Sequence, residues 1–600
     1  MEMVEAGQEL LLGGNLSLKG RSWVRRSYDE RLAAQISQQH DLPEVVGRLL
    51  AARGVDAENA DGFLNPSLRR SLPDPSVLLD MDAAVVRLLQ AIQRDEGIAV
   101  FGDYDVDGAT SAALLDRFFR ALGVGIRVYI PDRLKEGYGP NAAAMQQLAS
   151  EGISVVITVD CGIMAFEALE AAKEAGLDVI VVDHHKAEAR LPVSAAVINP
   201  NRLDDESGLG HLAAVGLAFM LAVGLNRALR EKGWYGGTRP EPDLKALLDL
   251  VALGTVCDVV PLKGLNRAFV CQGLKVMARR GNQGLVALAD LAGIDAAPNT
   301  YHAGFVLGPR INAGGRVGES GLGARLLASE DSAEAAKIAE QLDALNKERQ
   351  AIEAEVQAAA IERIEATLGP AGVPGPVIFA ASEGWHPGVI GIVASRLKER
   401  YGRPAFVLAI DGEEAKGSAR SISGLDIGAA VIEALRGGLL VGGGGHPMAA
   451  GLTVKTSKIN NLREFLEAWL GTRMGDELVL RPYEFDGQLS IGGLTPGLMD
   501  QIEQVGPFGA GNPAPRFVLR GVTLFKADIV GADHVRLIFG QADGQRLKGI
   551  AFRAAGEPLG QALLRGVGQR WHLAGRVKKD EWYSPPRVEL ILDDAASAEV

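Results

Sequence analysis

A repeated order of strand, loop and helix between residues 97 and 185 constrains the fold of this chain more than any other feature. Short runs rich in Val and Ile, in GIAVFGD, IRVYIPD, SVVITVD and DVIVVDHH, alternate with helical patterns such as TSAALLDRFFRALG and FEALEAAKEAG. Continuous apolar strands separated by amphipathic helices are typical of a parallel sheet covered on both faces. The sequence therefore predicts an open α/β sheet in this region.

The chain has 600 residues, which is too long for one hydrophobic core. Residues 342–368 contain neither Gly nor Pro, which predicts one long helix. From residue 516 onward, short alternating strands with turn residues predict a small closed barrel. The expected divisions are an N-terminal segment packing on the α/β unit (1–85), the α/β unit (86–335), a linker helix (336–370), a second, smaller α/β unit (371–465), a connector (466–515) and the barrel (516–600).

The composition excludes few functions, but it indicates the cellular compartment in which the protein works. Cys161, Cys257 and Cys271 form no CxxC pair, which is typical of a protein in a reducing compartment. The apolar run Leu212–Leu225 is too short for a membrane span, and the first residues show no secretory pattern. We therefore expect a cytoplasmic protein that does not engage a membrane. The net charge of -13 argues mildly against binding nucleic acid over the whole surface.

Acidic and imidazole side chains follow three of the predicted strands at the point where each strand ends. Because the carboxyl ends of parallel strands meet at one edge of a sheet, we expect these groups to lie together. Neighbouring carboxylates repel one another unless a cation lies among them. Asp258 adds a carboxylate in an otherwise apolar stretch, GTVCDVVP, where it is costly unless paired or metal-bound. The converging groups are Asp103, Asp105, Asp107, Asp160, Asp183, His184, His185 and Asp258.

This ligand set favours particular metals and a particular reaction. Carboxylates with one or two imidazoles suit Mn²⁺ or Mg²⁺ better than Zn²⁺. Five or six carboxylates leave room for two ions, and two ions about 3.5–4 Å apart can hold a phosphate and activate water. The pattern therefore indicates phosphoester hydrolysis.

Each of these residues also has an ordinary structural interpretation. A strand-end Asp such as Asp160 often caps a helix or forms a turn, and a buried His is often a hydrogen-bonded core residue. Cys161 is an alternative nucleophile, but the sequence shows no independent base beside it. The coincidence of all these groups on one sheet edge favours the metal site.

The motifs GDYDVDG, TVDCG, DHH and GTVCDVVPL resemble those of the DHH phosphoesterase superfamily. Within it, GPRINAGGR, LNKERQ, KGSARSISG, GGGGHPMAAGL and GPFGAGNPAPRF, in this order, resemble the RecJ family of bacterial single-strand-specific 5′ to 3′ exodeoxyribonucleases. The resemblance covers nearly the whole chain. It implies a DHH domain and a DHHA1 domain with a DNA channel between them, followed by an OB-fold barrel.

The resemblance also implies roles for the acidic and imidazole groups. Asp160 would bridge two Mn²⁺ or Mg²⁺ ions, and His185 would contact the scissile phosphate or the nucleophile. The implied metal ligands are Asp103, Asp105, Asp107, Asp160, His184 and Asp258. The implied catalytic residues are Asp105, Asp107, Asp160, His184, His185 and Asp258.

A second set of residues is expected to bind the substrate. Glycine-flanked backbone amides, hydroxyls and guanidinium groups can donate to phosphate oxygens, and barrel aromatics can stack on bases. The same residues could instead form turns, solvated loops and barrel core. The candidates are Arg310, Asn312, Arg316, Ser418, Arg420, Ser421, Gly444, Gly445, His446, Trp571, Lys578 and Lys579, with His572, Trp582 and Tyr583 as further barrel candidates.

Three functions are compared. The first is an exonuclease that degrades single-stranded DNA from its 5′ end to nucleoside 5′-monophosphates in recombination and repair. The second is a phosphodiesterase of the same superfamily for cyclic dinucleotides or very short oligonucleotides, which would not need the barrel. The third, an inactive DNA-binding or scaffold protein, is disfavoured because every expected ligand position holds a metal-competent side chain.

The resemblance also bears on partners. Single-stranded DNA is the implied substrate, and single-strand-binding protein and a RecQ-type helicase are candidate partners. Two lobes that close on one channel need no second chain, so we expect a monomer.

Overall fold

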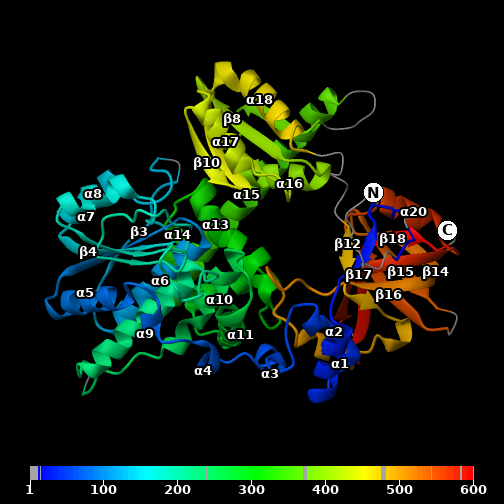
Figure 1. The fold of residues 1–600 in the computed structure, drawn as a ribbon, viewed down its shortest axis with the longest axis horizontal. Helices are drawn as coiled ribbons and strands as arrows, with labels where there is room; N and C mark the ends of the chain where they lie inside the picture. The colour runs from blue at the N-terminus through cyan, green and yellow to red at the C-terminus, as the bar shows by residue number, and fades with distance from the viewer. Residues whose placement is uncertain are drawn as a thin grey trace.

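The computed structural model describes residues 11–13, 15–133, 135–237, 239–368, 375–474, 482–541, 544–580 and 584–598. Three bodies are visible: a parallel-sheet unit at one end, a second α/β unit above the centre, and a barrel at the other end (Figure 1). No helix in the described ranges is both long and apolar enough to cross a membrane.

The first body contains the predicted parallel sheet. Its five strands lie in the order β3-β2-β4-β5-β6, and all neighbouring pairs are parallel. The strands are β2 (Gly97–Gly102), β3 (Arg127–Tyr129), β4 (Ile153–Val159), β5 (Asp178–Val182) and β6 (Ala196–Ile198).

Helices cover both faces of this sheet because each central strand is apolar on both sides. In β2, Ile98 and Val100 face the core shared with one set of helices, while Ala99 and Phe101 face a second core. The first set is α5 (Met81–Gln93), α6 (Val106–Ala121) and α9 (Ala214–Glu231), and the second is α7 (Ala142–Ser150) and α8 (Phe166–Glu174). The apolar run at Leu212–Leu225 lies mostly in buried α9.

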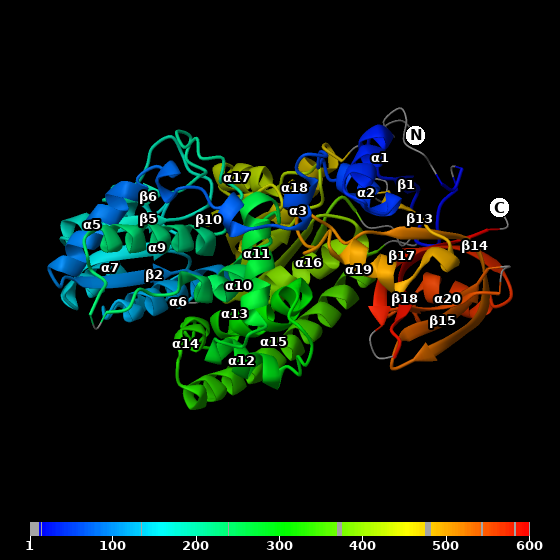
Figure 2. The same ribbon diagram turned by 90° about the horizontal axis from the view of Figure 1, so that it is seen from below.

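A helical layer continues the first core towards the second body. Its members are η2 (Leu244–Leu247), α10 (Leu248–Cys257), α11 (Gly264–Met277), α12 (Gln283–Leu291), η3 (His302–Leu307), α13 (Gly308–Val317) and α14 (Leu322–Ala328). The predicted long helix is α15, which runs from Ser332 to Thr367 (Figure 2). Ile338 packs in the first core and Ile364 in the second body, so α15 joins the two.

The second body is a five-stranded sheet in the order β10-β11-β9-β8-β7, in which β7 and β8 are parallel and the other pairs are antiparallel. Helix α18 belongs to its core, so the unit extends beyond the predicted boundary at residue 465. The elements are β7 (Ile378–Glu383), α16 (Ile390–Tyr401), β8 (Ala405–Asp411), β9 (Glu414–Arg420), α17 (Ile427–Arg436), β10 (Gly442–His446), β11 (Ala449–Lys455), η4 (Thr456–Lys458) and α18 (Ile459–Gly471).

The C-terminal body is the predicted closed barrel. The strand order β14-β15-β16-β18-β17 closes through a β14–β17 pairing, and β16–β18 is its one parallel pair within the five-strand ring. A helix between the third and fourth strands completes the OB-type topology. The elements are β14 (Phe517–Val530), β15 (His534–Gly540), β16 (Arg546–Ala551), α20 (Pro558–Arg565), β17 (Arg570–Asp580) and β18 (Arg587–Ser597), preceded by β12 (Tyr483–Phe485), β13 (Gly487–Gln488), η5 (Ile491–Gly493) and α19 (Pro496–Glu503).

The N-terminal segment departs from the expected packing. Strand β1 (Trp23–Arg25) pairs in parallel with β12, and α1 (Glu30–Gln39) and α2 (Glu44–Ala51) share the core of the barrel (Figure 2). Packing on the first α/β unit is therefore wrong for this part, although Leu78 and Met81 do join that unit's core. Two further helices, α3 (Ala60–Leu64) and α4 (Leu68–Ser71), and the turn η1 (Pro75–Val77) lie between the two regions.

Candidate metal centre and nucleic-acid interface

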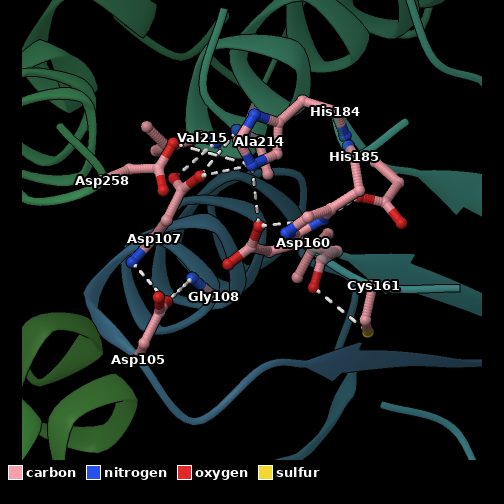
Figure 3. Close-up of polar contacts among 12 residues, drawn as sticks. Asp105, Asp107, Gly108, Asp160, Cys161, His184, His185, Ala214, Val215 and Asp258 are labelled. Atoms are coloured by element: carbon pink, nitrogen blue, oxygen red, sulfur yellow. Dashed lines mark hydrogen bonds and ion pairs between the residues drawn. The ribbon is translucent and has the colours of Figure 1, made fainter. Parts of the chain in front are cut away.

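The predicted acidic and imidazole groups converge at the carboxyl edge of the parallel sheet (Figure 3). Asp103 follows β2, Asp160 follows β4 with a φ of +61°, and His184 and His185 follow β5. Asp258 reaches the same place from the C-terminal end of α10. These groups therefore converge at the sheet edge, as the strand ends predicted.

Backbone N–H groups fix two of the carboxylates. Asp105 caps α6, because its Oδ1 accepts hydrogen bonds from the N–H groups of Asp107 at 2.9 Å and Gly108 at 3.1 Å. Asp107, on the first turn of α6, accepts from the N–H groups of Ala214 at 2.7 Å and Val215 at 2.9 Å. The start of α9 thus holds Asp107 in place.

His184 lies among three of the carboxylates. Its Nε2 is 3.2 Å from Asp160 Oδ1, 3.6 Å from Asp258 Oδ2 and 4.0 Å from Asp107 Oδ2. Burial, and then the neighbouring His185, lower the pKa of His184 to about 4. The imidazole is therefore neutral at physiological pH, which is the form that binds a metal ion.

Unpartnered buried atoms show that these residues fit divalent cations. Within the described part of the chain, Asp103 Oδ1, Asp160 Oδ1, His184 Nε2 and Asp258 Oδ2 are buried without a hydrogen bond of suitable geometry. Buried polar atoms rarely stay unpaired, since desolvating them is costly. Oxygen atoms with one or two imidazole nitrogens are ligands that Mn²⁺ and Mg²⁺ accept.

The same side chains divide into two non-overlapping groups, as two ions would require. Ligand atoms lie within 4.8 Å of one another in each group. A third group, Asp160 with His184 and His185, overlaps both, which agrees with a bridging position for Asp160. The two separate groups are Asp107, His184 and Asp258, and Asp103, Asp105 and Asp160.

Burial also controls the charge of the carboxyls. It is the largest cause that raises the pKa of Asp107 to about 7 and that of Asp258 to about 9, and nearby carboxylates add to it. The pKa values of Asp103 and Asp160 are raised well above the usual range for the same reasons. A divalent cation would displace these protons and restore the charged form.

Asp183 orients the two histidines, a role that sequence reasoning did not give it. Its Oδ1 accepts from His185 Nδ1 at 2.7 Å and from the backbone N–H groups of His184 at 2.8 Å and His185 at 3.1 Å, and its Oδ2 accepts from Ile163 N–H at 3.0 Å. Burial alone would lower the pKa of His185, but the bond to Asp183 and its charge outweigh burial and raise it. Asp183 therefore holds His185 in orientation and favours its protonated form.

Cys161 does not act as the nucleophile. Its thiol is buried in the core beneath the sheet and is oriented towards the Val159 carbonyl, with 3.4 Å between Sγ and O. Burial raises the pKa of the Cys161 thiol well above its usual value, so the thiolate is not accessible.

A cluster of arginines faces the carboxylates from both α/β units. Arg133 lies over the Tyr104 ring at 4.9 Å, and Arg316 donates to the Gly388 carbonyl of the second unit at 3.2 Å. Burial lowers the pKa of Arg316 to about 10, with further lowering by Arg133 and Arg349. The pKa of Arg420 falls through burial and then through Arg133.

This arginine cluster can bind an anion. Among the described residues, Arg133, Arg316 and Arg420 have no carboxylate within ion-pair distance, and such gathered positive charge attracts phosphate. Arg316 and Arg420 were predicted as substrate-binding residues. Arg133 was missed because a single Arg in a loop carries no distinguishing sequence signal.

Comparisons with known proteins agree with these observations. Three family models match the chain: the DHH family N-terminal domain over residues 97–255, the DHHA1 domain over 375–472 and the RecJ OB domain over 485–594. The chain is 36% identical over 97% of its length to the single-stranded-DNA-specific exonuclease RecJ of Bacillus subtilis strain 168, covering 72% of that protein. It is 37% identical over 94% of its length to RecJ of Dickeya dadantii strain 3937, covering 98% of it.

The chain belongs to the RecJ family. Its structure is similar to that of RecJ from Thermus thermophilus in complex with Mn²⁺, with a TM-score of 0.80, 28% identity, and coverage of 96% of this chain and 80% of that one. The Mg²⁺ complex of the same protein gives a TM-score of 0.72 at 27% identity, covering 96% and 79% of the two chains. The expected cofactor, Mn²⁺ or Mg²⁺, is thus supported by RecJ structures and by the ligand groups of this chain.

In the DHH domain, two further predicted substrate residues have different positions. Arg310 forms an ion pair with Asp343 of α15, with 2.9 Å between Nε and Oδ1, and donates to the Val306 carbonyl at 2.8 Å. It therefore anchors α13 to the linker helix. Asn312 lies half-buried on α13.

In the DHHA1 domain, the glycine-rich strand faces the DHH domain. Gly444, Gly445 and His446 are exposed on the edge strand β10. His446 and His185 both line a cavity of about 750 Å³ between the two domains. Ser418 accepts a hydrogen bond from Arg420 at 3.2 Å.

Ser421, in contrast, is fully buried. Its hydroxyl donates to the Leu425 carbonyl at 2.7 Å. This bond closes a local turn, so Ser421 is not placed to bind substrate as the sequence suggested.

In the OB domain, Trp571 is a core residue rather than a stacking platform. It is 5% exposed, and its Nε1 donates to the Gly566 carbonyl at 3.2 Å. Lys578 pairs with Glu589 at 3.3 Å and Lys579 with Asp500 at 2.5 Å. His572 accepts from a backbone N–H, while Trp582 and Tyr583 lie outside the described residues.

The outward face of β14, β15 and β16, with the residue that follows β16, carries exposed aromatic and basic side chains. Phe525 and Phe552 are 42% and 52% exposed, Arg546 lies over the Phe525 ring at 4.7 Å, and His534 packs against Phe552 at 5.2 Å between ring centroids. Exposed aromatics interleaved with basic groups on these strands are typical of single-strand binding by OB folds. Sequence alternation alone did not reveal which face of each strand points outward.

Proposed function

We propose that this chain, a single-stranded-DNA-specific exonuclease by family, removes nucleoside 5′-monophosphates from the 5′ end of DNA during recombination and repair. One observation carries the proposal: two groups of candidate metal ligands lie beside arginines that reach in from both lobes and have no carboxylate partner among the described residues. A phosphodiester held there would have cationic groups on one side and the metal ligands on the other.

The metal-binding roles follow from the two ligand groups. Asp107, His184 and Asp258 would hold one ion and Asp103, Asp105 and Asp160 the other, and Asp160 Oδ1 lies 3.2 Å from His184 Nε2 of the first group. Bound Mn²⁺ or Mg²⁺ would supply an activated water and neutralise charge on the phosphate. The sheet edge keeps these ligands rigid, because each follows a buried strand or lies at a helix end.

His185 has the geometry of a proton donor to the scissile phosphate. Its Nδ1 is bonded to Asp183 at 2.7 Å, so its Nε2 remains for the substrate, and the ring lines the cavity between the lobes. The raised pKa favours the form in which both ring nitrogens carry protons. His185 therefore stabilises negative charge as it develops on the phosphate.

The arginine cluster would bind the terminal phosphate of the strand. Arg133, Arg316 and Arg420 come from different elements and converge without carboxylate partners among the described residues. A 5′-terminal phosphate bound there would leave the next phosphodiester to the metal ligands, which accords with the proposed 5′ to 3′ polarity. The exposed OB face would hold the strand farther along, and a duplex would be excluded by its width.

The setting of the reaction is also part of the proposal. One chain supplies both ligand groups and the arginines, which supports a monomeric enzyme. The three free cysteines support a reducing, cytoplasmic compartment. Single-strand-binding protein and a RecQ-type helicase are proposed partners, because both would present the single strands that the site requires.

The proposed function is tested by digesting a 3′-labelled single strand and its duplex form with Mn²⁺. The wild-type protein should shorten the single strand only. Asp107→Ala should lower the rate by more than about 100-fold, because it removes a direct metal ligand. A turnover that is higher for a dinucleotide than for the long strand would instead assign the chain to the small-substrate class.

A further inference from the structure

A short backbone segment, residues 210–215, touches two of the metal ligands. The N–H groups of Ala214 and Val215 donate to Asp107 at 2.7 and 2.9 Å. The backbone of Leu212 is hydrogen-bonded to the side chain of His184. The position of this segment therefore affects both side chains at once.

Asn201 ties the first residue of this segment to the turn that carries the two histidines. Its Nδ2 donates to the His184 carbonyl at 2.5 Å and to the Gly210 carbonyl at 3.1 Å. Asn201 is itself held by Asn199, whose Oδ1 accepts from the Asn201 N–H at 2.7 Å and whose Nδ2 donates to the His185 carbonyl at 2.9 Å. A Cβ on Gly210 would lie 2.5 Å from Asn201 Oδ1, so the contact leaves no spare room.

Asn266 ties the same segment to the residues that follow Asp258. Asn266 lies on α11 and is fully buried. Its Nδ2 donates to the His211 carbonyl at 2.5 Å and to the Pro261 carbonyl at 3.1 Å. One amide group thus fixes the distance between this segment and the chain that leaves Asp258.

We propose that Asn201 and Asn266 are positioning residues that set the spacing of His184, Asp107 and Asp258 for a divalent cation. Each amide joins carbonyls of two separate elements, and neither side chain is in a metal-ligand group. Residues that orient metal ligands in this way tune the affinity for the ion or the activity, and a loss that is confined to affinity is recovered at high metal concentration. The inference rests on the proposed function only in requiring that the centre bind a divalent cation.

The test is calorimetric titration of Mn²⁺ into the full chain, for wild type, Asn201→Ala and Asn266→Ala. Each variant should bind Mn²⁺ about 10–100-fold more weakly. Hydrolysis should return towards the wild-type rate as Mn²⁺ is raised, because the ligands themselves remain. In the double variant, the Mn²⁺ affinity should fall by less than the product of the two single fold-changes, because both amides hold the same segment.

Asn282→Ala is the matched control. Asn282 is also buried and also donates to a carbonyl, that of Leu327 at 3.0 Å, but it lies outside the ligand groups. The Asn282→Ala substitution should lower the thermal stability of the protein without changing its Mn²⁺ affinity. If an alanine variant does not fold, Asn201→Asp or Asn266→Asp removes the same donor and keeps the side-chain shape.

The outcomes separate this inference from the proposed function. Unchanged Mn²⁺ affinity in folded Asn201 and Asn266 variants would overturn it, as would an equal loss in Asn282→Ala. A wild-type protein that binds no Mn²⁺ would also overturn it. Weaker binding in the two variants, in a protein that cleaves no DNA, would support the positioning role and reject the exonuclease.

Discussion

At the scale of single residues, burial decides which groups can change charge near neutral pH. It raises the pKa of Asp258 to about 9 and lowers that of His184 to about 4. Asp183 is the exception: although burial would raise its pKa, the bonds to His185 and to backbone N–H groups keep it low. The metal centre therefore combines a fixed carboxylate, a neutral imidazole and carboxyls that a cation deprotonates.

Asp249 offers a test of burial away from the metal centre. Burial raises its pKa to about 6, against opposing effects of the Leu250 N–H and Arg117. Because the folded-state pKa lies above the unfolded value, the folded protein holds a proton that the unfolded chain releases, so this stabilisation is present below about pH 4 and lost as pH rises through 6. Asp249→Asn removes this dependence.

We compare the unfolding free energy of the wild-type protein with that of Asp249→Asn at each pH. The difference between the two should change by roughly 2–3 kcal/mol from pH 4 to pH 8. The wild-type protein should become less stable relative to Asp249→Asn as pH rises. Denaturant unfolding across this range measures it, and a difference that is constant with pH would contradict the account.

The convergence of the candidate metal ligands could be predicted because a strand-end carboxylate has a position that depends on topology alone. Asp103, Asp160 and His184 follow three parallel strands, so their convergence follows from the sheet. Trp571 and Ser421 could not be placed in this way, because their orientation depends on packing and on a local turn. The same limitation hid the orienting role of Asp183.

At the scale of elements, α13 and α15 hold the two lobes together. Arg310 of α13 pairs with Asp343 of α15, and Arg316 at the end of α13 donates to Gly388 of the DHHA1 domain. Gly388 lies so close that a Cβ there would clash with the Arg316 carbonyl oxygen. The packing of α13 against the DHHA1 domain thus depends on a glycine contact.

Gly388→Ala should therefore displace the DHHA1 loop and disturb Arg316. We expect the KM for single-stranded DNA to rise on the order of tenfold or more, since small misplacements of binding groups are costly. Mn²⁺ affinity should stay unchanged. Steady-state kinetics with Gly497→Ala as control, where a Cβ meets nothing within 4 Å, would test this. Equal KM values in the two variants would show that the contact between Gly388 and Arg316 does not affect DNA binding.

At the scale of the whole molecule, the barrel is fixed to the DHH domain through a buried arginine. Arg267 of α11 donates to the carbonyls of Phe63 at 2.8 Å, Gln504 at 3.3 Å and Gly506, and its guanidinium lies over the Phe63 ring at 3.8 Å. Phe63 and Gln504 belong to segments that flank the barrel core. The OB face and the metal centre are thus parts of one framework.

The association of the N-terminal segment with the barrel was not predictable from the sequence. The apolar faces of α1 and α2 show that these helices pack on something, but not on which body. The decisive contacts join residues far apart in the chain, such as Trp23 with Asp594 at 3.2 Å and Arg53 with Asp486 at 3.6 Å. Only the three-dimensional structure brings these partners together.

The outward OB face should contribute to binding of long strands. Arg546→Ala should weaken that binding and reduce the slope of log K against log salt concentration by about 0.7, the value for one phosphate contact on a single strand. Lys578→Ala should have a smaller effect, since Lys578 is paired with Glu589. Fluorescence anisotropy at several salt concentrations measures both effects. A larger effect of Lys578→Ala than of Arg546→Ala would instead place the DNA path over Lys578.

The most direct test of the account is the identity of the first product. One single-stranded, 5′-phosphorylated oligonucleotide is digested with Mn²⁺ for short times, and the released nucleotides are identified by mass spectrometry. We expect the 5′-terminal nucleoside 5′-monophosphate to appear first, because the arginines are proposed to hold the terminal phosphate beside the candidate metal ligands. First release of the 3′-terminal nucleotide, or of internal fragments, would contradict it.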